Sequence, residues 1–150
     1  MSTESIHGFF ISEHTTKEKD KSRLNVLRSI KSEFLIYQSK GKDFILTESI
    51  EFDILRSMIK QREKSISEYK LAGRVDLVEK ETLEISLIKE YLPKEPEKDE
   101  LIKYLMICSG FSEGHILKKN MGLVIKQMKE KFPNASGKLI SDIVKQYIKN

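Results

Sequence analysis

Apolar residues recur every three or four positions along most of this chain, and that spacing places them on one face of an α-helix. In the first such segment, between Asp20 and Gly41, the apolar face comprises Leu24, Leu27, Ile30, Phe34 and Leu35. Aspartate is a residue type that caps the start of helices, and glycine is one that ends them. No alternating pattern long enough for a β-sheet appears in the sequence. The periodicity therefore predicts an all-α fold.

Two more helices are expected in the first 92 residues. The second follows Thr47, another capping residue type, and its apolar face comprises Leu55, Met58, Ile59, Ile66 and Tyr69. The third follows Gly73 and ends at Pro93, and its apolar face comprises Leu77, Val78, Ile85, Ile88 and Leu92. Proline ends it because its ring disfavours helical backbone in the preceding residue. These helices predict an N-terminal helical hairpin or bundle unit over residues 1–92.

The segment 93–97, Pro-Lys-Glu-Pro-Glu, is predicted to be a hinge because its prolines and charges favour extended, exposed backbone. Beyond it, residues 98–150 predict a small C-terminal unit of three helices. The first is expected to run through Leu101 and Cys108 to Gly110. The second follows Asn120 and the third follows Ser136. The predicted architecture is therefore an all-α protein of two small units.

Two of the apolar faces contain a charged residue where an apolar one would fit the period. Arg62 lies between Ile59 and Ile66, and Glu81 lies between Val78 and Ile85. A buried charge without a partner costs several kcal/mol. We therefore expect Arg62 and Glu81 to form an ion pair that fixes the pairing of two helices.

The net charge of +4 is unevenly distributed along the chain. Residues 118–150 carry eight lysines against two acids, a net charge of +6, so the preceding residues sum to −2. The lysines are Lys118, Lys119, Lys126, Lys129, Lys131, Lys138, Lys145 and Lys149. Such a basic end is typical of a protein that binds phosphates. It is equally common on helices that only need solubility, and no aromatic residues are interleaved here, so both interpretations stay open.

The sequence predicts neither a catalytic centre nor a metal or small-molecule cofactor. Its three histidines, His7, His14 and His115, are scattered and none has a cysteine or histidine at ligand spacing. The Gly-Lys pairs lack the upstream glycine of a phosphate-binding loop. The single cysteine, Cys108, excludes an internal disulfide and is expected to be packed. With no apolar segment of signal-peptide or membrane-spanning length, a cytoplasmic location is expected.

Several segments together resemble a known family. They are Leu24–Lys31, the stretch from Tyr69 to Glu81 that includes Ala-Gly-Arg-Val-Asp-Leu, Tyr91-Leu-Pro93, Asn120-Met-Gly122 and Ala135-Ser-Gly-Lys138. This combination is similar to the GatB/YqeY family over almost the whole chain after about residue 17. The C-terminal motifs depart from the family pattern, because Leu123 and Asn134 stand where the family often has lysine and arginine.

The resemblance implies a stand-alone version of the helical tail on the B subunit of the glutamine-dependent aspartyl/glutamyl-tRNA amidotransferase. The family activity is described as that of a carbon–nitrogen ligase with glutamine as amide donor, and in that enzyme the tail helps hold tRNA. The first hypothesis is an accessory module that binds tRNA, without catalysis of its own. The second is a protein-interaction adaptor that docks amidotransferase subunits or another protein. The third is an enzyme acting as a detached amidotransferase component.

Under the first hypothesis the phosphate-binding candidates are basic residues. They are Arg74, Lys118, Lys119, Lys126, Lys138 and Lys145. Arg74 follows a helix-ending glycine, so it either faces a phosphate or serves only the turn between two helices, in which Asp76 begins the next helix. The first sixteen residues match no pattern, and Ile6, Phe9 and Phe10 suggest an extra helix there.

Overall fold

The computed structural model describes residues 19–150, so the extra helix suggested by Ile6, Phe9 and Phe10 lies outside the described residues. The chain divides into two compact units, Met1–Pro93 and Lys94–Asn150, called here the N-terminal and the C-terminal unit. The described residues are predominantly helical, which confirms the predicted all-α class. None of the described helices combines the length and the apolar character needed to cross a membrane.

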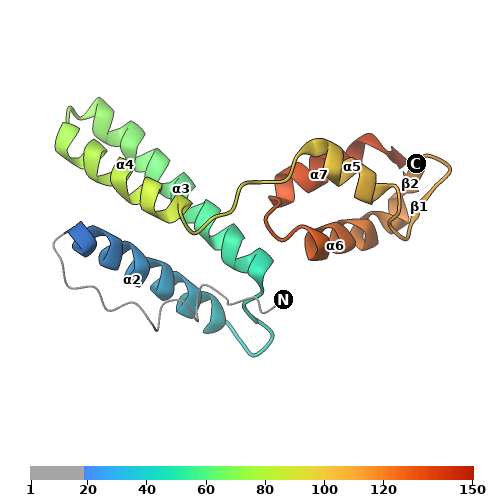
Figure 1. Ribbon diagram of the computed structural model, residues 1–150, viewed down its shortest axis with the longest axis horizontal. Coiled ribbons are helices and arrows are strands. Elements are labelled where there is room, and N and C mark those ends of the chain that lie inside the picture. The colour runs from blue at the N-terminus through green and yellow to red at the C-terminus, as the bar shows by residue number, and fades with distance from the viewer. Residues whose placement is uncertain (1–18) are drawn as a thin grey trace. The chain divides into compact units, whose positions relative to one another are not determined.

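Three helices make up the described part of the N-terminal unit: α2 (Lys19–Gln38), α3 (Glu48–Leu71) and α4 (Val75–Lys89). Helices α3 and α4 form an antiparallel hairpin, and α2 packs on both (Figure 1). The Thr47 hydroxyl caps α3 as expected, accepting a hydrogen bond from the Ile50 amide over 3.3 Å. After α4 the backbone hydrogen bonds span three residues, which is tighter than in an α-helix, and these turns lead to Pro93.

The core of the N-terminal unit is formed by the apolar faces of its three helices. Its fully buried side chains include Ile30, Phe34, Leu55 and Ile88. The prediction of the buried face of α2 was wrong at one position, because Leu35 is 50% exposed and Val26 is buried instead. Because each helical residue turns by about 100°, the four-residue spacing from Val26 to Phe34 stays on one side and Leu35 rotates out of it.

The C-terminal unit packs three helices against a very small sheet. Its elements are α5 (Lys98–Leu105), β1 (Phe111–Ser112), β2 (His115–Leu117), the 3₁₀ helix η1 (Lys118–Asn120), α6 (Met121–Lys131), α7 (Gly137–Gln146) and β3 (Ile148–Lys149). Strand β2 pairs antiparallel with β1 and parallel with β3. The core contains residues from all three α-helices and from β2, among them Leu105, Val124, Ile140 and Ile116.

Two sequence expectations for this unit are corrected. The helix expected to reach Gly110 ends at Leu105. Tight turns follow at Cys108, and Gly110 adopts a left-handed φ of +102°. These turns bring Phe111 into register with Ile116. The strands were not expected because two or three residues are too short to show alternation.

Candidate functional site

The predicted phosphate-binding lysines of the C-terminal unit lie on its surface. The exposed ones are Lys118, Lys119, Lys126, Lys138 and Lys145. In the part of the chain that the structure describes, none of them forms an ion pair within 4 Å. Their ammonium groups are therefore available to an external anion, as phosphate binding would require.

One lysine of α6 reaches the start of α7. The Nζ atom of Lys129 on α6 lies beside Gly137, 3.5 Å from the position that a Cβ atom on Gly137 would occupy. Lys138 is the next residue, and Lys126 precedes Lys129 by one helical turn. Lys129 was not among the candidates, although its three-residue spacing from Lys126 could have indicated it.

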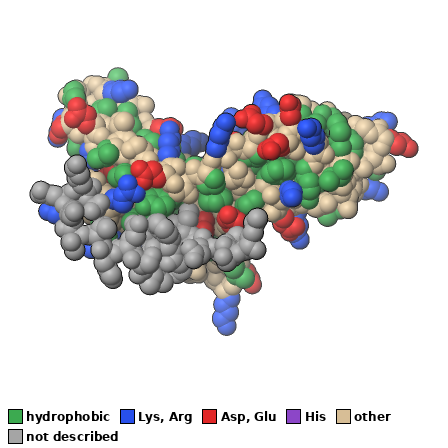
Figure 2. Space-filling model, in the orientation of Figure 1, with side chains coloured by type: hydrophobic (Ala, Val, Ile, Leu, Met, Phe, Trp, Pro, Cys, Tyr) green, Lys and Arg blue, Asp and Glu red, His purple; other side chains and the backbone are tan. Residues whose placement is uncertain are grey.

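Acidic residues also lie near these basic positions. Asp142 lies between Lys138 and Lys145 on the outer face of α7, four residues from the first and three from the second. Glu130 likewise follows Lys126 by four residues on α6. On the face shown in Figure 2, Lys and Arg side chains stand among acidic ones and form no continuous patch. Because Lys129 of α6 reaches the start of α7, we take Lys126, Lys129 and Lys138 together as the candidate for a phosphate contact.

The loop between α6 and α7 is held by contacts inside the unit. The Ser136 hydroxyl caps α7 by accepting a hydrogen bond from the Leu139 amide over 3.2 Å. The Asn134 side chain donates to the Lys94 carbonyl over 2.8 Å. Asn134 stands where the family often has arginine, and here its amide is engaged with the backbone at the start of the unit.

Arg74 lies in the turn between α3 and α4, and the turn explains its position. Gly73 adopts a left-handed φ of +70°. The Gly73 and Arg74 amides donate to the Lys70 and Tyr69 carbonyls over 3.2 and 3.0 Å. This pair of bonds is the Schellman arrangement that satisfies the last carbonyls of a helix. Asp76 lies in the first turn of α4, as expected.

The guanidinium of Arg74 is already occupied by a carboxylate. Its Nε and Nη2 atoms donate to the two carboxylate oxygens of Asp76 over 3.1 and 3.0 Å. This contact, helped by the Leu77 amide, lowers the pKa of Asp76 below its ordinary value of 3.8, and it raises the pKa of Arg74. Both residues are exposed, so a phosphate could exchange with Asp76 but would have to compete with it.

The structure also brings Arg62 and Glu81 together. Arg62 on α3 contacts two carboxylates on α4: its Nη1 lies 3.4 Å from Glu81 and 2.9 Å from Glu84. Glu84 was missed, although its position three residues after Glu81 places both on one face of α4. All three side chains are less than one-fifth exposed. The arrangement holds two helices together electrostatically.

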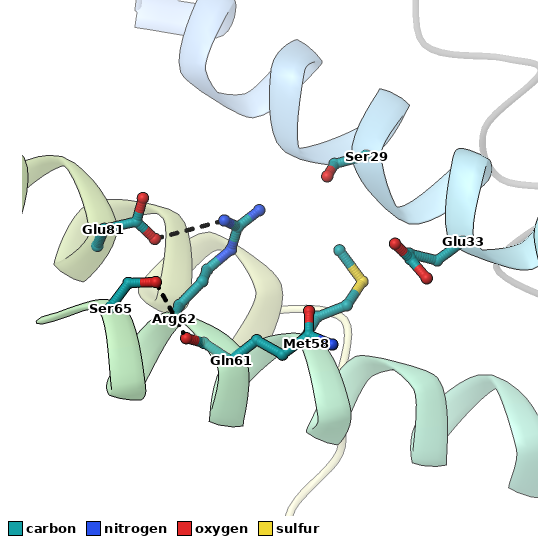
Figure 3. A pocket seen from close by; sticks show the side chains of 7 residues that line it. All are labelled: Ser29, Glu33, Met58, Gln61, Arg62, Ser65 and Glu81. Carbon is teal, nitrogen blue, oxygen red and sulfur yellow. Dashed lines mark hydrogen bonds and ion pairs between the residues drawn. The ribbon is translucent and has the colours of Figure 1, made fainter. Parts of the chain in front are cut away.

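A cavity of about 200 Å³ lies beside this cluster (Figure 3). Its lining comprises Ser29 and Glu33 from α2, Met58, Gln61, Arg62 and Ser65 from α3, and Glu81 from α4. The Ser65 hydroxyl donates to the Gln61 carbonyl, so it has no activating base. Among the described residues no group of three or more His, Cys, Asp or Glu side chains is placed to hold a metal ion. We assign no reaction to this cavity.

The fold and these surfaces define a small helical protein of two units with a lysine-rich C-terminal end. The family model described as Yqey-like protein matches residues 12–148, so the chain belongs to the YqeY-like family. This confirms the family resemblance found in the sequence.

Several curated fungal proteins are similar to this chain. "Altered inheritance of mitochondria protein 41, mitochondrial" of Pyrenophora tritici-repentis is 35% identical over 103 residues, covering 65% of this chain and 55% of that protein. The proteins of the same name from Kluyveromyces lactis and Saccharomyces cerevisiae are 36% and 35% identical, covering 49% and 51% of this chain. The chain spans only 40% of each of those two relatives, and these names state no ligand or reaction.

Proposed function

We propose that this YqeY-like protein is an accessory module of tRNA-dependent amidation that holds the tRNA backbone and performs no catalysis of its own. The observation that carries the proposal is the position of Lys129, whose Nζ atom lies beside Gly137 at the start of α7, next to Lys138 and one turn after Lys126. None of these three lysines has an ion-pair partner among the described residues. The support from the family is its relation to an amidotransferase tail.

The chemistry of this edge suits backbone contact and not base reading. Lysine presents a compact point charge that binds phosphate oxygens without a fixed orientation, whereas base edges are read by planar groups such as arginine, asparagine and glutamine. Helices α6 and α7 also contain no aromatic residue on which bases would stack. We therefore expect affinity for many tRNAs with little sequence preference.

The test is binding of the full chain to total tRNA by fluorescence anisotropy at about 50 and about 200 mM salt. Each phosphate contact releases counterions, so two or three contacts predict an affinity loss of at least about tenfold over this range. Lys126→Gln, Lys129→Gln and Lys138→Gln should each reduce the slope of log affinity against log salt by about one.

The matched control is Lys31→Gln on α2, which removes an exposed charge of the other unit that has no ion-pair partner among the described residues. It should leave the slope unchanged. Absence of tRNA binding at the lower salt, or an equal effect of Lys31→Gln and Lys138→Gln, would contradict the proposal. The protein-interaction adaptor would then become the leading interpretation.

A further inference from the structure

The turn that follows α5 exposes two aliphatic side chains. Met106 is 52% exposed and Ile107 is 76% exposed, directly after a helix whose other apolar residues are largely buried. Exposed aliphatic residues are common singly, but several gathered at one place indicate an interaction surface.

A third exposed aliphatic side chain belongs to α6, the helix against which this turn packs. The Ser109 amide and carbonyl are bound by the Gln127 side chain over 3.1 and 2.9 Å. Gly110 lies against Asn120 and Val124, where an added Cβ would approach within 3.2 Å of both. The turn is therefore seated along one side of α6. Leu123, which is 49% exposed, lies one turn before Gln127 on that side. We call Met106, Ile107 and Leu123 the aliphatic patch.

Lysines surround the aliphatic patch. Lys103 lies three and four residues before Met106 and Ile107 on the last turn of α5. Lys119 and Lys126 lie four residues before and three residues after Leu123. All three lysines are exposed and none has an ion-pair partner within the described chain. The acids Asp99 and Glu100 on α5 and Glu130 on α6 lie a further turn away, so the charged residues next to the patch are lysines.

We propose that the aliphatic patch docks an acidic amphipathic helix of a partner protein. The apolar face of such a helix would cover Met106, Ile107 and Leu123, and its flanking carboxylates would meet Lys103, Lys119 and Lys126. A protein is favoured over nucleic acid because the patch has aliphatic side chains and no ring on which a base could stack. It is favoured over a lipid surface because the patch contains none of the aromatic anchors of membrane interfaces.

The test uses the full chain and a fluorescein-labelled peptide of about 18 residues, with leucines at helical spacing on one face and glutamates beside them. Two control peptides are used. In one the same residues are scrambled so that the leucines share no face, and in the other lysines replace the glutamates. The expected result is that the acidic amphipathic peptide binds and that both controls bind at least about tenfold more weakly.

The deciding variant is Ile107→Ser combined with Leu123→Ser, since both side chains are exposed and contribute little to the core. It should weaken peptide binding by about tenfold or more. The matched control is Leu83→Ser on α4, whose side chain is also 49% exposed, and its affinity should equal that of the original chain. Equal binding of the acidic and basic peptides, or no effect of the double substitution, would overturn the proposal.

Two further measurements distinguish other occupants. Both apply if the acidic peptide does not bind. Loss of binding to phosphatidylglycerol vesicles in the double variant would then assign the patch to lipid. Loss of self-association in sedimentation in the double variant would assign it to a second copy. The proposed docking of a partner helix is separate from the proposed tRNA binding, and either can be contradicted while the other holds. The double variant keeps all its lysines, so its tRNA affinity and salt slope should stay unchanged even when peptide binding is lost.

Discussion

Arg62 of α3 is paired more closely with Glu84 of α4 than with Glu81, its Nη1 atom lying 2.9 Å from the Glu84 carboxylate. The distance to Glu81 is 3.4 Å. The Nε atom of Arg62 is buried and has no hydrogen-bond partner in the described structure. One guanidinium therefore serves two carboxylates one turn apart, and the charge pattern in the sequence indicated only one of them.

We predict that Arg62→Met destabilises the N-terminal unit by about 2 kcal/mol, below the cost of breaking a fully buried pair because these groups keep some solvent contact. The loss arises because Glu81 and Glu84 would lie side by side on α4 without a cation. Urea unfolding followed by circular dichroism measures it. The control is Lys60→Met, an exposed residue of the same helix, which should change stability by less than about 0.5 kcal/mol.

The same pair allows a finer comparison. Glu84→Gln should cost more unfolding free energy than Glu81→Gln, since the opposite charges of Arg62 and Glu84 lie closer together than those of Arg62 and Glu81. Equal costs, or a larger cost for Glu81→Gln, would show that the Glu84 contact does not dominate the cluster.

Two glycines should respond to alanine with opposite signs. Gly73 has a φ of +70° and open space around it, so Gly73→Ala should destabilise by about 1 kcal/mol through backbone strain alone. Gly122 lies in α6, also with open space, so Gly122→Ala should stabilise by about 0.5–1 kcal/mol. Thermal unfolding of both variants checks this. A stabilising Gly73→Ala would contradict the left-handed turn after α3.

The pairing of Asp76 with Arg74 predicts a specific titration. The carboxyl of Asp76 should titrate below its ordinary pKa of 3.8, because the Arg74 guanidinium and the Leu77 amide favour its charged form. A pKa lowered by folding stabilises the protein above the ordinary value, and this contribution is lost as the pH falls through the lowered one. Carboxyl NMR follows the titration. In Arg74→Gln the pKa should rise towards 3.8, and an unchanged value would refute the pairing.

Cys108 should be a slow thiol in the folded protein. It is buried, and burial raises its pKa because the thiolate is poorly solvated. Reaction with 5,5′-dithiobis(2-nitrobenzoate) at pH 8 should be much slower in buffer than in denaturant. Fast reaction in buffer would mean that the turn between α5 and β1 opens readily. Cys108→Ala is the blank, since it removes the only cysteine of the chain.

The helices were predictable because the information for them is local. Thr47, Gly73 and Ser136 act on amides or carbonyls a few residues away, and the apolar spacing of α3 and α4 survives in their buried faces. The lysine-rich character of the C-terminal end was predictable for the same reason, because it is a count along the chain. Grouping Lys129 with Lys138 required the structure, since it depends on how α6 meets Gly137.

The sequence by itself determined the helical class, the start of α3 and α7, and the need for a counter-charge to Arg62. Only the tertiary structure decided that Glu84 is the closer partner, since that depends on how α3 and α4 are rotated against each other. It also decided the small sheet, in which Ile116 pairs with Ile148. Contacts between residues so far apart depend on the packing of everything between them, and a local pattern carries no record of that packing.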